Sequence, residues 1–191
     1  MKNFKTILVT TIALTLICVV TAAALGFTNE LTAKRIAEVE RKAEQEAMTR
    51  VISAADYKQA TTVINESTYT YYTAVDAEGA IYGYIFTTSA NGYGGEVKVM
   101  VGVDTEGVVS AIEVLDVSNE TPGLGQNAGK KSFWEQFKGK SSEIGVSHSD
   151  PDENEVQAIT GATITTTAVK NAVNKALSIY SNIEKEAGNN G

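Results

Sequence analysis

The stretch EVKVMVGVDTEGVVSAIEVL, residues 96–115, decides the fold of this 191-residue chain. Polar and apolar side chains alternate over residues 96–103, which is typical of a β-strand with one buried face. Asp104-Thr105-Glu106-Gly107 then forms a short connection, and residues 108–115 are again rich in apolar side chains. These features predict two antiparallel strands joined by a tight turn.

The flanking sequence extends this pattern to a sheet with helices. Residues 68–75 (TYTYYTAV) and 80–87 (AIYGYIFT) predict another hairpin around a short connection. Residues 130–138 (KKSFWEQFK) predict a short helix, and an apolar stripe beginning near Thr165 predicts a last helix. Two hairpins and separate helices indicate an α+β domain, with an antiparallel sheet flanked by helices.

The N-terminal residues predict a membrane anchor. Residues 7–27 (ILVTTIALTLICVVTAAALGF) carry no charge and are long enough to cross a bilayer as one helix. A cleaved signal peptide is the alternative, with small residues at 22–24, but the apolar run is longer than a usual signal core. We expect a single transmembrane anchor over residues 1–29 and a helical stalk over 30–62, which is rich in Ala, Glu, Lys and Arg.

The charge balance bears on partners and location. The chain has 16 Lys and Arg against 23 Asp and Glu, a net charge of −7, which argues against a nucleic-acid partner. Basic residues flank the apolar run on both sides, so they do not orient it by themselves. A long domain translocates largely regardless of charge, so we expect the folded domain, residues 63–185, outside the cytoplasm. Residues 186–191 are expected to be a flexible tail.

The scarcity of cysteine and histidine restricts the chemistry. Cys18 is the single cysteine and His148 the single histidine, so an internal disulfide, an iron–sulfur cluster and a histidine cluster are excluded. His148 precedes the acidic run at 150–153, but one histidine among carboxylates is usually solvated surface. We predict no metal site and no catalytic residue, and any redox chemistry requires an organic cofactor.

Two loops have the composition of a binding site. Residues 119–125 (NETPGLG) follow the last predicted strand, and their glycines would let a flat ligand approach the backbone; an ordinary surface loop is the alternative. Residues 159–169 (ITGATITTTAV) lead into the last helix, whose free N–H groups favour a phosphate. Here the alternative is that Thr163 caps the helix.

Taken together, these features resemble the FMN-binding domain family. The resemblance rests on the apolar anchor, the sheet with GYGGEVKVMVGVDTEG (92–107), the ETPGLG loop and AITGAT before a helix. Within that family, the chain is most similar to RnfG-type subunits of the Rnf ion-translocating electron-transport complex. The similarity runs from the anchor to Val173, and the two loop motifs in this order are a specific combination.

The resemblance implies a covalently bound cofactor. It implies that FMN is attached through its phosphate to Thr163, by a separate flavin transferase that uses FAD. Many family members carry an acidic residue at the position of Gln157. The implied cofactor-binding residues are Glu120, Thr121, Gly123 and Leu124 beside the flavin, and Thr160, Gly161 and Ala162 around the phosphate; the 92–95 loop is a weaker candidate.

The implied function is electron transfer within a membrane complex. The chain would carry electrons between cofactors of other Rnf subunits, in a complex that couples ferredoxin:NAD oxidoreduction to ion translocation, with no substrate site of its own. The alternatives are the flavin subunit of a Na⁺-translocating NADH:quinone reductase, and a membrane-anchored binding or assembly module without flavin.

Overall fold

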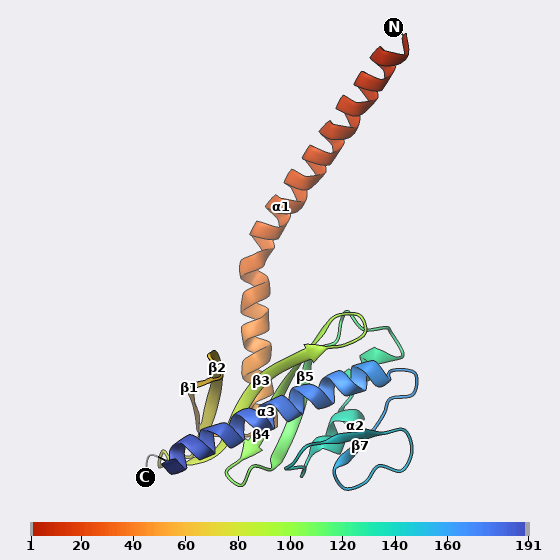
Figure 1. Ribbon diagram of the computed structural model, residues 1–191. Helices are drawn as coiled ribbons and strands as arrows, with labels where there is room; N and C mark the ends of the chain where they lie inside the picture. The colour runs from red at the N-terminus through yellow and green to blue at the C-terminus, as the bar shows by residue number, and fades with distance from the viewer. Residues whose placement is uncertain (1, 190–191) are drawn as a thin grey trace. The chain divides into compact units, whose positions relative to one another are not determined.

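The computed structural model describes residues 2–189, and the chain divides into two compact units, Met1–Ala43 and Glu44–Gly191. Figure 1 shows the elements along the chain. They are α1 (Lys2–Val51), β1 (Asp56–Ile64), β2 (Ser67–Val75), β3 (Ile81–Asn91), β4 (Glu96–Asp104), β5 (Val109–Asp116), η1 (Gly125–Gly129), α2 (Lys131–Trp134), η2 (Glu135–Phe137), β6 (Gly145–Ser147), β7 (Glu155–Gln157) and α3 (Thr163–Asn189).

The first unit consists of helix α1 up to Ala43. Its threonines satisfy their hydroxyl groups within the helix, since Thr10, Thr21 and Thr28 each donate to the carbonyl four residues earlier, at 2.6 to 2.8 Å. This arrangement suits an apolar surrounding, where no water is available to a free hydroxyl. Among the described residues, one helix is long and apolar enough to cross a bilayer, at Phe4–Val51.

The second unit is built on a five-stranded antiparallel sheet in the order β1-β2-β3-β4-β5. Both predicted hairpins are confirmed, as β2–β3 and β4–β5. The two connections are held in the same way. The carboxylate of Asp76 in the first, and of Asp104 in the second, accepts two hydrogen bonds of 2.8 to 3.0 Å from backbone N–H groups. Gly79 and Gly107 then turn the chain with positive φ. The α+β class predicted from the sequence is confirmed.

Each face of the sheet is covered by a helix. On one face, α3 packs over β3 and β4 in a large core that includes Phe86, Val101 and Val173 (Figure 1). On the other face, the last two turns of α1 pack on Ile85 and Met100. Strand β4 is therefore buried on both sides, which explains its run of apolar residues.

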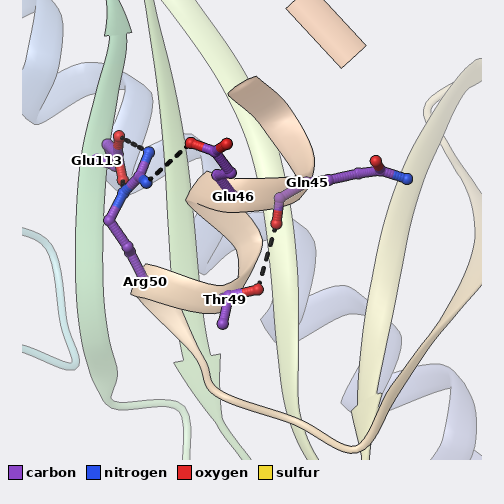
Figure 2. A network of polar contacts seen from close by, with 5 residues as sticks. All are labelled: Gln45, Glu46, Thr49, Arg50 and Glu113. Carbon is purple, nitrogen blue, oxygen red and sulfur yellow. Dashed lines mark hydrogen bonds and ion pairs between the residues drawn. The ribbon is translucent and has the colours of Figure 1, made fainter. Parts of the chain in front are cut away.

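Polar contacts fasten the end of α1 to the outer strand of the sheet. Arg50 donates from Nε and Nη2 to the two carboxylate oxygens of Glu113 on β5, at 2.6 and 2.7 Å (Figure 2). Its Nη1 also lies 3.6 Å from Glu46, and Lys98 pairs with Glu44 at 2.6 Å. The last turns of α1 thus belong to the folded unit.

Two boundaries predicted from the sequence are wrong. The predicted stalk extends to residue 62, but α1 ends at Val51 and β1 begins at Asp56. Strand β1 exposes most of its side chains, so its sequence lacks the alternation that marks a half-buried strand. The last helix begins at Thr163 and continues to Asn189, so residues 186–189 of the predicted tail are helical; residues 190 and 191 lie outside the described part of the chain.

Candidate functional site

Three loops converge at the first turn of α3. They are the β3–β4 turn at 92–95, the segment 117–124 after β5, and the segment 158–162 after β7. Between them lies a cleft of about 530 Å³, which is a size typical of ligand sites. The cleft is lined by Tyr93, Glu120, Thr121, Leu124, Gly125, Gly161, Ala162, Thr163, Ile164 and Thr165.

Glu120 joins its own segment to the 92–95 turn and to helix α3. Its side chain is only 3% exposed, and its Oε2 accepts a hydrogen bond of 2.5 Å from Thr165 Oγ1 on α3. Its Oε1 accepts a hydrogen bond of 3.0 Å from the backbone N–H of Gly94. A buried carboxylate requires such hydrogen-bond partners.

The glycines around Glu120 are required by close packing. A Cβ added at Gly94 would lie 1.8 Å from the carbonyl oxygen of Asn119. A Cβ at Gly92 or Gly125 would lie 2.3 or 2.4 Å from the carboxylate oxygens of Glu120. Glycine is therefore required at Gly92, Gly94 and Gly125 because a larger side chain would prevent the close packing of the two loops.

Helix α3 starts with free donors beside the cleft. Thr166 N–H bonds to Ala162 O at 3.0 Å, which makes Ala162 the residue that begins the helical hydrogen bonds. The N–H groups of Thr163, Ile164 and Thr165 form no backbone hydrogen bond with a described residue. Such groups, with the helix dipole, form a site for an anionic group.

The hydroxyl of Thr163 is available. Thr163 is half-buried, lines the cleft and makes no side-chain hydrogen bond within residues 2–189. The alternative that Thr163 caps the helix is therefore wrong. Instead, Thr166 closes the preceding turn, because its Oγ1 accepts from Ile159 N–H and donates to Ala162 O, both at 3.0 Å.

The rim of the cleft is apolar. Tyr93 is 73% exposed, Ile164 55% and Leu124 42%. Large apolar side chains that remain this exposed around one cleft mark a surface that a ligand or partner would cover. An aromatic ring system fits such a rim, with its polar tail at the helix N-terminus.

The structure brings six of the eight predicted site residues to this cleft. Glu120, Thr121, Leu124, Gly161, Ala162 and Thr163 all line it. Gly123 does not; its φ of +77° forms the turn, and its carbonyl accepts from Asn127. Thr160 lines a neighbouring cleft with Lys130 and Gln157. Gly161, with a φ of +75°, reverses the chain between Thr160 and Thr163.

Three lining residues were missed by sequence reasoning, namely Gly125, Ile164 and Thr165. Thr165 stands three residues before Ala168 and four before Val169, so the apolar stripe of the last helix could have predicted its burial. The sequence makes the 92–95 loop a weaker candidate, yet Tyr93 lies on the rim, because Gly94 is bonded to Glu120. No signal in the sequence reveals that bond.

Metal-binding side chains do not cluster elsewhere in the described part of the chain. Within the described part of the chain, no group of three His, Cys, Asp or Glu side chains is placed to hold a metal ion. His148 is exposed, and Asp150, two residues further on, adopts a φ of +56° in a surface turn.

Comparison with known proteins identifies the class to which this site belongs. The FMN-binding domain family matches residues 92–178, which include the three loops and most of α3, so the folded unit contains an FMN-binding domain. The RnfG N-terminal region matches residues 1–51, the extent of α1.

The full-length relatives are more specific. The chain is 35% identical to the G subunit of the Na⁺-translocating ferredoxin:NAD⁺ oxidoreductase complex of Acetobacterium woodii, over 96% of both chains. It is 28% identical to the G subunit of the ion-translocating oxidoreductase complex of Methanosarcina acetivorans, over 95% of this chain and 98% of that one. The chain therefore belongs to the RnfG family.

Solved structures share the fold. The C subunit of the Na⁺-translocating NADH-quinone reductase from Parabacteroides distasonis superposes with a TM-score of 0.52 and 27% identity, over 61% of this chain and 62% of that one. NqrC from Shewanella oneidensis superposes with a TM-score of 0.51 at 16% identity, over 63% and 64% of the two chains, and supports the fold alone.

Proposed function

We propose that this chain is a membrane-anchored electron carrier that holds FMN through a phosphoester to Thr163. In this proposal it works in an ion-translocating ferredoxin:NAD oxidoreductase complex, beside the other subunits of that complex. The proposal is supported by the FMN-binding domain, by the match to RnfG relatives along the chain, and by the free hydroxyl of Thr163.

The cleft fits the cofactor. A phosphate on Thr163 would meet the free N–H groups of the first turn of α3, which stabilise negative charge. Leu124, Ile164 and Tyr93 would offer an apolar surface to the flavin ring. When bound, FMN supplies the capacity to accept and donate electrons, which protein side chains lack.

The protein's own residues hold and shape the site. Glu120 fixes the GYGG turn against α3, and Thr166 fixes the turn before Thr163. Rigid positioning of the loops keeps the cofactor in one orientation. Glu120 lines the cleft with Thr163, but both of its carboxylate oxygens accept hydrogen bonds from Gly94 N–H and Thr165 Oγ1, so attachment is assigned to a flavin transferase with FAD as the donor.

The proposed location rests on the anchor. We propose that α1 crosses the cell membrane once and that the folded unit lies outside the cytoplasm. The candidate span and the family's membership in ion-translocating complexes support the anchor. A tethered carrier stays close to its redox partners, which raises its effective concentration.

The single observation that carries the covalent link is the free, half-buried Thr163 hydroxyl in the cleft. The test is flavin fluorescence of the full chain in a denaturing gel, after co-expression with a flavin transferase. Fluorescence should persist in the wild type and in Thr160→Val, whose side chain faces the neighbouring cleft, and should disappear in Thr163→Val.

The rival functions give different results. Fluorescence that persists in Thr163→Val would place the link elsewhere. Absence of fluorescence from exported wild-type chain, with an active transferase, would favour an anchored binding or assembly module without flavin. A quinone-reductase subunit would also fluoresce; the relative matched over 96% of both chains favours the ferredoxin:NAD complex.

A further inference from the structure

A second cleft lies on the folded unit, away from Thr163. It has a volume of about 390 Å³ and lies between the end of α1, the edge strand β5 and the short helices α2 and η2. We call it the β5 groove. It is lined by Arg50, Ser110, Ala111, Ile112, Glu113, Lys131, Trp134, Glu135 and Lys138, none of which lines the FMN cleft.

The β5 groove lies in a basic part of an acidic unit. Residues 44–191 contain ten Lys and Arg against twenty Asp and Glu. Residues 130–140 reverse this balance, with four lysines against Glu135 alone. Complementary surface charge directs association between proteins. A basic segment on an acidic unit therefore indicates a surface that binds an acidic partner.

The two lysines of the groove form no strong ion pair with another described residue. Lys131 is 82% exposed and lies 3.8 Å from Glu135, an exposed pair that contributes little. Lys138 is exposed and forms no ion pair with any residue in the described range 2–189. Arg50, in contrast, is held in the wall by its two bonds to Glu113 (Figure 2).

An aromatic side chain is fixed beside these lysines. Phe133 and Phe137 of the same segment are buried in the core, whereas Trp134 is half-buried and lines the groove. Its Nε1 donates to Ala128 O at 2.7 Å, which fixes the ring. Tryptophan is among the side chains most enriched at the anchor points of protein–protein interfaces.

We propose that the β5 groove docks an acidic polypeptide segment, carrying an apolar side chain, from another subunit of the complex. Acidic residues of the segment pair with Lys131 and Lys138, and its apolar side chain packs on Trp134. The groove is concave and has the carboxylates of Glu113 and Glu135 in its walls, which suits a chain more than a flat anionic bilayer. The proposal uses membership in a multi-subunit complex and does not depend on the Thr163 link.

The test is photo-cross-linking in membranes that hold the complete complex. The photoreactive residue p-benzoylphenylalanine replaces Trp134 in the full chain, and adducts are identified by mass spectrometry. We expect an adduct to an acidic segment of another subunit of the complex. In Lys131→Glu with Lys138→Glu, its yield should fall about tenfold or more, because attraction becomes repulsion.

The matched control is Lys58→Glu with Lys185→Glu. It changes the net charge equally, and both lysines are exposed and outside the groove. The adduct should survive this change. A lipid adduct, no adduct, or equal loss in both double variants would overturn the proposal. Flavin fluorescence of each variant, read in the same gel, separates loss of docking from loss of cofactor.

Discussion

At the residue scale, Glu120 determines how the site is assembled. The resemblance implies that Glu120 lies against the flavin, and in the structure its two carboxylate oxygens accept hydrogen bonds from Gly94 N–H and Thr165 Oγ1. Its contribution is then to position the GYGG turn and α3 rather than to touch the ring with a free oxygen.

Replacement of Glu120 should destabilise the folded unit. In Glu120→Ala, the buried Thr165 Oγ1 and the backbone N–H of Gly94 both lose their acceptor, which should lower the free energy of unfolding by about 2–3 kcal/mol. Glu120→Gln keeps one acceptor oxygen and should cost about half as much. Thermal unfolding of the full chain in detergent measures both; an unchanged melting temperature in Glu120→Ala would contradict this role.

Individual site residues were predictable to different degrees. Thr163, Gly161 and Ala162 are implied by the resemblance that the TGAT motif carries, whereas the residues alone leave a helix cap at Thr163 as the alternative. Thr160 could not be assigned to the right cleft, since the reversal at Gly161 depends on its positive φ. The bond from Gly94 to Glu120 joins residues 26 positions apart, which no local pattern encodes.

At the element scale, the start of α3 depends on Thr166. Its buried hydroxyl accepts from Ile159 N–H and donates to Ala162 O. Thr166→Val keeps the shape but leaves Ile159 N–H unpaired, so the free energy of unfolding should fall by about 1–2 kcal/mol. Flavin fluorescence should also decrease, because the turn before Thr163 loosens.

Thr167→Val is the matched control for this prediction. Thr167 is the next residue of the helix and is half-buried, and none of the hydrogen bonds that hold the turn involves it. Its change should leave flavin fluorescence close to the wild-type level. Equal loss of fluorescence in both variants would show that the Thr166 bonds do not position Thr163.

The junction of α1 with β5 depends on Arg50. Hydrogen bonding to Glu113 raises the pKa of Arg50 above its ordinary value. A raised pKa on a cation stabilises the fold below the unfolded pKa, and this contribution is lost only as pH rises through the folded value, above the physiological range. The contribution of Arg50 to the free energy of unfolding is therefore constant across ordinary pH values.

Arg50→Ala should leave the Glu113 carboxylate, 12% exposed, without its partner. Because Arg50 itself is 52% exposed and screened by solvent, the expected loss is modest, about 1–2 kcal/mol. Arg35→Ala, whose exposed pair with Glu38 lies in the first unit, should cost less than about 0.5 kcal/mol. Urea denaturation compares the two, and equal losses would contradict a structural role for the junction.

The hairpins were predictable because the same turn residues occur in both of their connections. Both hairpins carry an Asp at the start and a Gly at the end of a four-residue connection, and the structure uses both residues in the turn. Strand β1 escaped prediction because its side chains are mostly exposed, and its stability comes from pairing with β2. The three-residue strands β6 and β7 are too short to show any period.

At the scale of the whole molecule, the chain combines an apolar helix with a folded unit that carries the cleft at Thr163 and the β5 groove. One cleft has the free hydroxyl of Thr163 at a helix start, and the other has an exposed basic wall around Trp134. In the proposed account, the apolar cleft with an anion-binding end would hold the cofactor, and the charged groove would hold a partner.

The central claim is the bond between FMN and Thr163, and peptide mapping of the full chain by tandem mass spectrometry tests it most directly. The chain would be purified from membranes and digested, and the peptide containing residues 159–169 would be fragmented. The account predicts a mass increase of one FMN less one water, localised to Thr163. A quantitatively unmodified peptide, or the same mass on Thr160, Thr165 or Thr166, would contradict it.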